Sequence, residues 1–445
     1  IPAFAPYTKM NAVVDDPARL PDMLRQAFRV ATTGSPGPVH LQLAGNTGQA
    51  IENAEIDFDG VIEAEYGQVP PDRPQPDLNK VREAAQRISE AQRPVIVAGA
   101  GVKYSGAYEA LNHLAEAMHV PVATSLNAKD AILDNNPLSV GVVGTYSRRS
   151  ANQVVAEADL VIFVGTRAGG MTTHFWTIPA KGTSTIQIDI DPLVNGRNYP
   201  TDVSIVGDAR VTLEKMNELN IPVPKERVEW LKQVKAICTS YKIDFKEVYE
   251  SDAYPIRPER IVNELSNGMP KNAVIVVDTG HSGMWMGGMF EKRHEGQSYI
   301  RSAGHLGWAF PAALGAKCGA PHRPVVCFMG DLGFWYHMAE VETAVRAGIN
   351  TITIINNNNS GNMAKGSISA IYDDQPTKES QDIWVQNKIN FAKIAENMGA
   401  VGIRVEKANE IAPAFQKALK LDKPVVIDIA TDIEIVAPKA WEPKA

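Results

Sequence analysis

Two polar segments of the sequence carry residue types that could hold a metal ion and a phosphate group together. The first is Gly330–Gly333 and the second is Asn356–Ser360, and Asn358 lies 27 positions after Asp331. A carboxylate, a side-chain amide and a backbone carbonyl are oxygen ligands of the kind that Mg²⁺ binds, usually together with substrate phosphates. Glycines at both ends of the first segment let the backbone approach a diphosphate, which the start of a following helix also favours. These residues therefore predict a magnesium–diphosphate site.

Both segments stand where neighbouring strands of a parallel sheet should end. Apolar runs at Pro324–Gly330 and Thr351–Ile355, with a helical stretch at Met338–Ala347 between them, have the pattern of a βαβ unit. Ligands of open α/β sheets bind at the carboxyl ends of such strands. Asparagine and glycine are also common turn residues, so a purely structural role is the alternative for either segment alone. Their joint occurrence at this spacing favours a binding site.

Two series of alternating apolar and amphipathic stretches predict an α/β protein with two doubly wound parallel-sheet domains and the tail of a third. The first series has expected strands at Pro94–Gly99, Val120–Thr124, Asp159–Gly165 and Thr185–Asp189, with helices at Ala107–Met118 and Ser150–Ala158. The second adds strands at Ala273–Asp278 and Pro424–Ala430. A helix at Leu20–Thr32 and a strand at Gly37–Leu43 form the tail. We expect a connector to end at residue 76, a middle domain at 77–222, a linker at 223–255 and a last domain at 256–445.

Composition excludes several classes of partner. The 445 residues carry a net charge of −7 and no basic stripe, so neither nucleic acid nor an anionic membrane is an expected partner. No apolar run reaches the length of about 20 residues that a membrane span needs, and we expect a cytoplasmic protein. Cys238, Cys318 and Cys327 have no CxxC spacing and are expected to be buried structural thiols. The chain begins at Ile1 without a methionine, and we expect an upstream portion.

The two polar segments resemble the cofactor motif of thiamine-diphosphate enzymes, GDG followed at a similar distance by NN, in the register of acetohydroxyacid synthase-like members. The resemblance implies thiamine diphosphate and Mg²⁺ as cofactors, with Asp331, the Asn358 amide and the Ser360 carbonyl as metal ligands. Leu332 stands where the family has glycine, alanine or serine, so a diphosphate contact there depends on the backbone or on Gly333. The other cofactor contacts implied in these segments are at Gly330, Gly361, Asn362 and Met363.

Two further segments resemble cofactor loops of the same family. Asp278–Trp285 resembles the diphosphate loop, which places Gly280, His281 and Ser282 against the phosphates, although a histidine there could equally be a solvated loop residue. Ser302–Ala313 resembles the segment that holds the aminopyrimidine. By that resemblance the carbonyl of Gly304 accepts from the 4′-amino group, and the Leu306 side chain wedges between the two rings, unless it is plain core. His305 beside it is a candidate proton donor and the one catalytic candidate in this chain.

The resemblance extends over the whole chain. Thr32–Val39 is similar to the end of the family's pyrimidine-binding domain, so residues 1–76 would be the C-terminal part of that domain, and Ile186–Ala209 is similar to the end of the middle domain. Flavin-carrying members hold FAD where Gly99, Gly101 and Arg167 stand, and an ADP-type ligand or no ligand are the alternatives. Because the family's cofactor lies between subunits, a homodimer, a homotetramer or a separate chain supplying the missing pyrimidine-domain part is implied.

The reaction implied is cleavage or ligation of a carbon–carbon bond in a 2-oxo acid, 2-hydroxy ketone or 1,2-diketone, a small-molecule carbonyl substrate. An acetolactate synthase-like carboligase, a decarboxylase and a diketone hydrolase are not separable from these residues. Ser367 stands where biosynthetic members have a tryptophan, which argues against large 2-oxo acids. The family's activating glutamate belongs to the region expected upstream of Ile1, so we expect the chain alone to be inactive.

Two other readings remain open from the sequence. Leu332 and the absence of the activating region from this chain are compatible with a non-catalytic or regulatory homologue that binds a nucleotide or cofactor. An NAD-dependent dehydrogenase is the weaker alternative, because neither βα series contains the full glycine fingerprint with its acidic partner.

Overall fold

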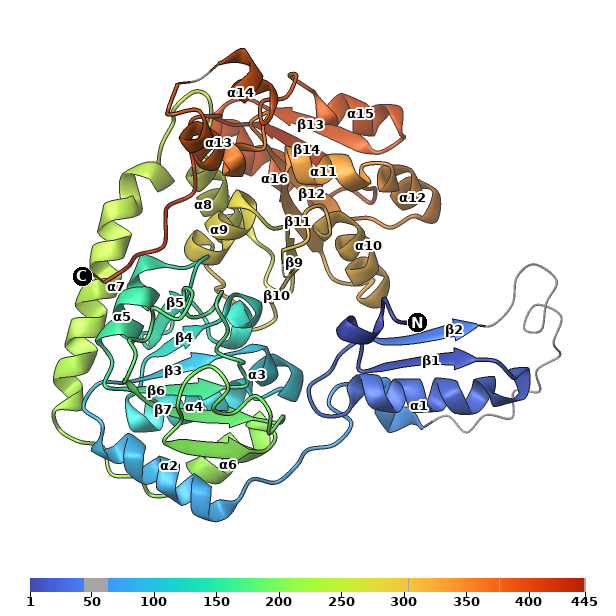
Figure 1. Cartoon of the computed structure of the whole chain (residues 1–445). Helices are drawn as coiled ribbons and strands as arrows, with labels where there is room; N and C mark the ends of the chain where they lie inside the picture. Colours follow the sequence, from blue (N-terminus) through green and yellow to red (C-terminus); the bar gives the residue numbers. More distant parts are fainter. Residues whose placement is uncertain (44–62, 303, 376, 444–445) are drawn as a thin grey trace.

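The computed structural model describes residues 1–43, 63–302, 304–375 and 377–443, in which the strands form three parallel sheets (Figure 1). The smallest sheet pairs β1 (Met10–Val14) with β2 (Val39–Leu43), and the amphipathic helix α1 (Leu20–Thr32) joins them. The helix at Leu20–Thr32 has the expected bounds, whereas β1 was not predicted from the sequence. The arrangement of two doubly wound sheets and a third, smaller element confirms the expected fold class.

The middle domain is built on a six-stranded parallel sheet in the order β5-β4-β3-β6-β7-β8. Its central strands are buried along their whole length, and hydrophobic clusters lie on both faces of the sheet, as expected for parallel strands covered by helices on both sides. The strands are β3 (Pro94–Ala98), β4 (Val122–Thr124), β5 (Ser139–Val142), β6 (Leu160–Val164), β7 (Ser184–Asp189) and β8 (Val203–Val206); the helices are α2 (Leu78–Glu90), α3 (Ala100–Ser105), α4 (Tyr108–Met118), α5 (Arg149–Glu157) and α6 (Ala209–Asn217).

The last domain repeats this architecture with the strand order β10-β9-β11-β12-β14-β13. The strand order reverses between β9 and β11, the place where open α/β sheets bind ligands. Its strands are β9 (Val274–Val277), β10 (Ser298–Arg301), β11 (Val325–Gly330), β12 (Ile352–Asn357), β13 (Val401–Val405) and β14 (Val425–Ala430); its helices are α8 (Pro258–Gly268), α9 (His281–Met289), α10 (Ala309–Gly319), α11 (Asp331–His337), α12 (Glu340–Ala347), α13 (Lys365–Ile371), α14 (Lys378–Asp382), α15 (Phe391–Asn397) and α16 (Ile411–Ala418).

The segment between these two domains is an ordered helix that packs on both of them. Helix α7 (Arg227–Tyr249) runs along the side of the molecule in Figure 1. Trp230 near its start donates from Nε1 to the carbonyl of Pro94 at 3.0 Å in the middle domain. Tyr241 near its end donates to the carbonyl of Gly288 at 3.2 Å in the last domain. The segment 223–255 thus connects the domains in sequence and also braces them.

The cysteines differ from expectation. Cys327 is buried on β11, but Cys318 is exposed on α10 and Cys238 is partly exposed on α7. The prediction of buried thiols is therefore wrong for Cys318, because its side of α10 faces away from the sheet. Within the described ranges, no helix is long and apolar enough to cross a membrane.

Candidate cofactor site

The polar segments singled out in the sequence meet at the carboxyl ends of β9, β11 and β12. A methyl group placed on Gly330 would lie 3.5 Å from Oγ of Ser282, which brings the end of β11 against the start of α9. One placed on Gly361 would lie 3.1 Å from the Leu332 side chain. The loops that follow β9, β11 and β12 therefore share one site at the point where the strand order of the sheet reverses.

Asp331 is a buried acid directly after β11, with 2% of its surface exposed. Its carboxylate accepts hydrogen bonds from the backbone N–H of Leu332 at 2.7 Å and of Ser360 at 3.1 Å. Among the described residues, no lysine, arginine or histidine forms an ion pair with it. Burial raises the pKa of Asp331 to about 6. A buried carboxylate without a cationic partner is a strong position for a cation that comes from outside the chain.

Asn358 lies beside Asp331 through their common neighbour Ser360. Oγ of Ser360 donates to Oδ1 of Asn358 at 2.9 Å, while its backbone N–H donates to Asp331. The neighbouring asparagines have other partners: Asn357 donates to Asp428 at 2.8 Å, and Asn359 accepts from the N–H of Ile389. Asn357 and Asn359 thus have structural partners, Oδ1 of Asn356 is buried without a partner among the described residues, and Asn358 is the amide that lies beside Asp331.

The loop at the start of α9 faces the segment after β12. Nδ1 of His281 lies 2.8 Å from Oδ1 of Asn362, and a methyl group on Gly280 would lie 3.6 Å from the sulfur of Met363. Burial lowers the pKa of His281, although the bond to Asn362 opposes that effect. His281 is therefore a neutral, hydrogen-bonded side chain near pH 7. The His281 ring is partly exposed, and it contacts Asn362 and Trp285.

Asp278, at the end of β9, is a functional position that sequence reasoning did not select. It is fully buried and accepts from the backbone N–H of Gly307 at 2.9 Å. A methyl group on Gly333 would lie 2.3 Å from Oδ2 of Asp278, so glycine at 333 is explained by this carboxylate rather than by a diphosphate. Asp278 thereby joins three segments of the site. Its place directly after an apolar strand, next to Thr279 and Gly280, was the signal that could have found it.

The segment that resembles the aminopyrimidine loop lies between this site and the middle domain. Gly304 and His305 are exposed, and Leu306 is partly exposed. Leu306 belongs to none of the hydrophobic clusters of the described residues, which removes the reading of Leu306 as plain core. The His305 ring lies 6.5 Å from that of His337, and its Nδ1 contacts the carbonyl of Leu306 at 3.0 Å.

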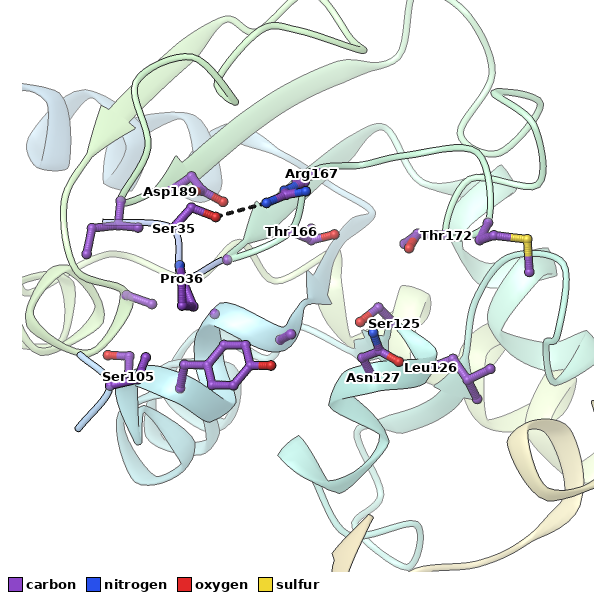
Figure 2. A pocket seen from close by; sticks show the side chains of 18 of the residues that line it. Ser35, Pro36, Ser105, Ser125, Leu126, Asn127, Thr166, Arg167, Thr172 and Asp189 are labelled. Carbon is purple, nitrogen blue, oxygen red and sulfur yellow. Dashed lines mark hydrogen bonds between the residues drawn. The ribbon is translucent and has the colours of Figure 1, made fainter. Parts of the chain in front are cut away.

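A cavity of about 540 Å³ opens where the strand order of the middle domain reverses, between β3 and β6 (Figure 2). Gly101 and Arg167 line it, together with Asp189 at the end of β7, whereas Gly99 does not. Figure 2 shows Arg167 hydrogen-bonded to Ser35 of the N-terminal part, at 3.0 Å. Burial raises the pKa of Asp189. The cavity continues to Thr279 and Gly304 of the last domain.

Close backbone packing explains the glycines at this reversal point. The N–H of Gly101 donates to the carbonyl of Gly165 at 2.9 Å, and a methyl group on Gly165 would lie 2.6 Å from Cα of Gly101. Gly165 also has a φ of +59°, which residues with side chains rarely adopt. Gly99 would place a methyl group 2.2 Å from the same carbonyl. These glycines keep the two loops together, and that packing opens the cavity beside them.

The residues at the β11 and β12 ends suit a hard cation that is shared with a phosphate. No group of three His, Cys, Asp or Glu side chains that could hold a metal exists in the described part of the chain. The ends of β11 and β12 instead offer oxygen ligands in the Asp331 carboxylate and the Asn358 amide, which share Ser360 as a neighbour. Mg²⁺ binds in this way, through one or two protein ligands and substrate phosphates.

Comparison with known proteins assigns both large domains to one family of enzymes. Residues 81–216 match the central domain of thiamine pyrophosphate enzymes, and residues 278–429 match the C-terminal TPP binding domain. A probable acetolactate synthase large subunit of Methanococcus aeolicus is 32% identical over 96% of this chain and 73% of its own length. The acetolactate synthase large subunit of Corynebacterium glutamicum is 32% identical over 95% of this chain and 67% of its own. A glyoxylate carboligase of Escherichia coli is 30% identical over 95% and 72%.

Proposed function

Because this chain belongs to the thiamine pyrophosphate enzymes of the acetolactate synthase type, we propose that it ligates or cleaves a carbon–carbon bond beside the carbonyl of a small 2-oxo acid. Bound thiamine diphosphate supplies the carbanion chemistry, and the protein positions and polarises the reacting groups. The observation that carries the proposal is the shared contact of Asp331 and Asn358 with Ser360.

We propose that Asp331, the Asn358 amide and the Ser360 carbonyl hold Mg²⁺, and that the diphosphate lies along Gly280, Ser282 and Gly330. Support comes from the burial of Asp331 without a cationic partner and from the contact between the β11 end and the start of α9. Because the Leu332 N–H donates to Asp331, it is not available to the phosphate. The chain would therefore hold the phosphate with neighbouring groups of Gly361, Asn362 and Met363.

We propose that Gly304 and Leu306 hold the aminopyrimidine and keep the cofactor bent, with His305 at the side of the reacting atoms. Leu306 is available for such a contact, since it lies outside the hydrophobic clusters and is partly exposed. A side chain that keeps the cofactor bent holds two reacting groups next to each other, and this proximity alone removes a large part of the activation barrier. Asp278 supports this loop through the N–H of Gly307.

The names of the relatives narrow the substrate class. Acetolactate synthases and a glyoxylate carboligase are among them, so we propose that a short 2-oxo acid such as pyruvate or glyoxylate is the donor. A carboligase is favoured over a diketone hydrolase on this ground. The two acetolactate synthases are called large subunits, and we propose that the chain works in a homodimer or homotetramer, or with a separate chain that completes the cofactor site.

Calorimetry with thiamine diphosphate and Mg²⁺ tests the proposal first. We expect micromolar binding that disappears when the metal is removed with EDTA, because the site has too few protein ligands to hold the diphosphate without the ion. Carbon dioxide release from pyruvate or glyoxylate tests the reaction once the region that carries the family's activating glutamate is supplied with the chain. Binding of NAD instead of thiamine diphosphate would overturn the proposal in favour of a dehydrogenase, and cofactor binding without turnover of any 2-oxo acid in that completed enzyme would favour the non-catalytic homologue.

We propose that the middle-domain cavity holds FAD along Gly101 and Arg167, with Gly99 keeping the loop in place. A carboxylate at a strand end, such as Asp189, commonly accepts from ribose hydroxyls. FAD should therefore bind with quenched flavin fluorescence, and Asp189→Ala should weaken it by about tenfold, as expected for loss of one or two hydrogen bonds. Glu214→Ala, at an exposed position on α6, is the control and should leave the affinity unchanged. Binding of ADP without any binding of FAD would contradict the flavin assignment.

A further inference from the structure

Arg301, the last residue of β10, has a side chain without a hydrogen-bond partner in the described part of the chain. No described residue forms a hydrogen bond or an ion pair with its guanidinium group, and its buried Nε atom has no acceptor. Its guanidinium group lies over the ring of Tyr146, whose centroid is 5.5 Å from the guanidinium carbon. Burial lowers the pKa of Arg301, but an arginine remains charged throughout the physiological range.

Two fully buried arginines have acceptors for most of their donors, although Nε of Arg227 also has none among the described residues. Arg227 donates to three backbone carbonyls, and Arg148 pairs with Asp134 and donates to the carbonyl of Gly288. The acid that acts on Arg301 most directly is Asp278, whose oxygens already accept from Gly307. The Arg301 side chain is partly exposed, but its Nε is buried without an acceptor. Burying a charged donor without a partner is costly, so the side chain indicates an anion that the described residues do not supply.

The position of Arg301 indicates where that anion would lie. Arg301 lines the 540 Å³ cavity together with Thr279 and Gly304, which adjoin the diphosphate loop and the aminopyrimidine loop. Leu126 and Tyr146 of the middle domain form the apolar wall of the same end. A small anion in this end of the cavity would contact Arg301 and lie next to the residues proposed to hold the reacting part of the cofactor.

We infer that Arg301 is a specificity-determining residue that binds the carboxylate of a small substrate in the cavity between the two large domains. The inference rests on the proposed function, because it names the group by which that site would recognise its substrate. The guanidinium fork matches a carboxylate in a bidentate manner, and the Tyr146 ring holds the fork from one face. A phosphate of a bound dinucleotide offers the same oxyanion chemistry, and the experiment separates the two sources.

The experiment uses the full chain with thiamine diphosphate and Mg²⁺ and two unreactive probes, lactate and its neutral analogue lactamide. Wild type should bind lactate more tightly than lactamide. Arg301→Gln should weaken lactate binding by about ten- to a hundredfold, as expected for loss of a bidentate charge-assisted contact, and should leave lactamide unchanged. The lactate affinity of Arg301→Lys, which keeps the charge but not the fork, should lie between those of wild type and Arg301→Gln. Arg346→Gln, at an exposed position on α12, is the control.

Each outcome bears on the inference. With pyruvate or glyoxylate, and with the region that carries the family's activating glutamate supplied, Arg301→Gln should raise KM by at least about tenfold with a smaller change in kcat, because uniform binding is lost. Equal lactate affinity in wild type and Arg301→Gln, with thiamine diphosphate still bound, would overturn the inference and leave the proposed function intact. Failure of wild type to bind thiamine diphosphate would instead count against the proposed function. Weaker FAD binding in Arg301→Gln with unchanged lactate affinity would assign the anion to the dinucleotide and overturn the substrate assignment.

Discussion

Asp331→Asn should abolish the Mg²⁺-dependent binding of thiamine diphosphate and leave the chain folded. Asp331 is the one ionisable side chain among the proposed metal ligands, and it is almost completely buried. Asparagine has nearly the same shape but no charge, and it can accept only one of the two backbone hydrogen bonds from Leu332 and Ser360. We expect the affinity for the cofactor to fall by about a hundredfold or more, since even the outer partners of metal ligands are worth ten- to a hundredfold. Calorimetry with the metal present measures it.

The protonation of Asp331 gives this prediction a pH dependence. Burial raises the pKa of Asp331 to about 6, whereas an aspartate in an unfolded chain titrates near 4. The metal binds the ionised form of Asp331, so lowering the pH from 7.5 to 5 should weaken metal-dependent binding about tenfold. At the lower pH, Asp331 of the free chain carries a proton, which is released when the metal binds. The charge-free asparagine variant has no such dependence in its residual binding.

The same pKa difference acts on the stability of the metal-free chain. The folded state keeps the Asp331 proton up to about pH 6, and the unfolded state releases it near pH 4. The free energy of unfolding should therefore fall, by up to roughly 3 kcal/mol, as the pH rises from 4 to above 6. Urea unfolding in EDTA should show this decline in wild type and in the control Asp382→Asn, an exposed position on α14, but not in Asp331→Asn. Cofactor binding by Asp331→Asn equal to that of wild type would contradict the proposed metal site.

The strands that the sequence predicts and those that it misses differ in their place in the sheet. The expected strands, such as Asp159–Gly165 and Pro324–Gly330, are central, and their apolar runs reflect burial on both faces. The four strands missed in the two large domains are all at sheet edges: β5, β8, β10 and β13. Edge strands are partly exposed and short, as the alternating burial of β8 shows, so they have too few apolar residues for a clear pattern.

For the candidate site as well, the sequence predicts relationships between residues of one local unit but not those between distant segments. The spacing of Asp331 to Asn358 is fixed by one βαβ unit, so it could be read from the sequence. The roles of Asp278 and Arg301 depend on which loops lie opposite them, namely those of Gly307, Gly333 and Tyr146. A single sequence contains no signal for such contacts between distant segments. The same holds for α7, which the sequence marks only as a polar helix and which the structure places across both domains.

A buried cluster of charges between the two large domains is another feature that the sequence does not reveal. Asp134 accepts from Arg148 at 2.9 Å, from Lys129 at 3.4 Å and from the backbone N–H of Lys292 at 2.7 Å. Arg148 also donates from Nε to the carbonyl of Gly288 at 2.8 Å, so it joins the middle domain to the last one. Nearly all of this cluster is shielded from solvent.

The two cations of the cluster are not equivalent. Burial lowers the pKa of Lys129 to about 8, so its attraction to Asp134 does not offset the loss of water. Burial alone would raise the pKa of Asp134, but Lys129 and Arg148 together hold it below its ordinary value. Judged by the pKa of Lys129, its pair with Asp134 is unfavourable, whereas the pKa of Asp134 indicates that its cationic neighbours stabilise it. The distances explain the difference, because Arg148 is closer to Asp134 than Lys129 is and has further acceptors. Arg148 is therefore the main partner of Asp134.

Arg148→Met should therefore destabilise the chain strongly, while Lys129→Met should not. Loss of Arg148 leaves Asp134 with its weaker partner and the Gly288 carbonyl with Tyr241 as its remaining donor, which should lower the free energy of unfolding by about 3–5 kcal/mol. Loss of Lys129 removes a charge whose burial costs roughly 3 kcal/mol at neutral pH, so we expect a change between zero and a gain of about 2 kcal/mol. Scanning calorimetry should show separated domain transitions only for Arg148→Met.

Arg149→Met provides the matched control, because the neighbouring Arg149 makes a partly exposed ion pair with Asp244 and should change stability by less than about 1 kcal/mol. The advantage of Lys129→Met should shrink as the pH rises from 8 to 10.5, since the folded chain loses the Lys129 proton before the unfolded chain does. Equal losses for Lys129→Met and Arg148→Met would mean that both cations are needed to neutralise Asp134, and that the distances do not rank them.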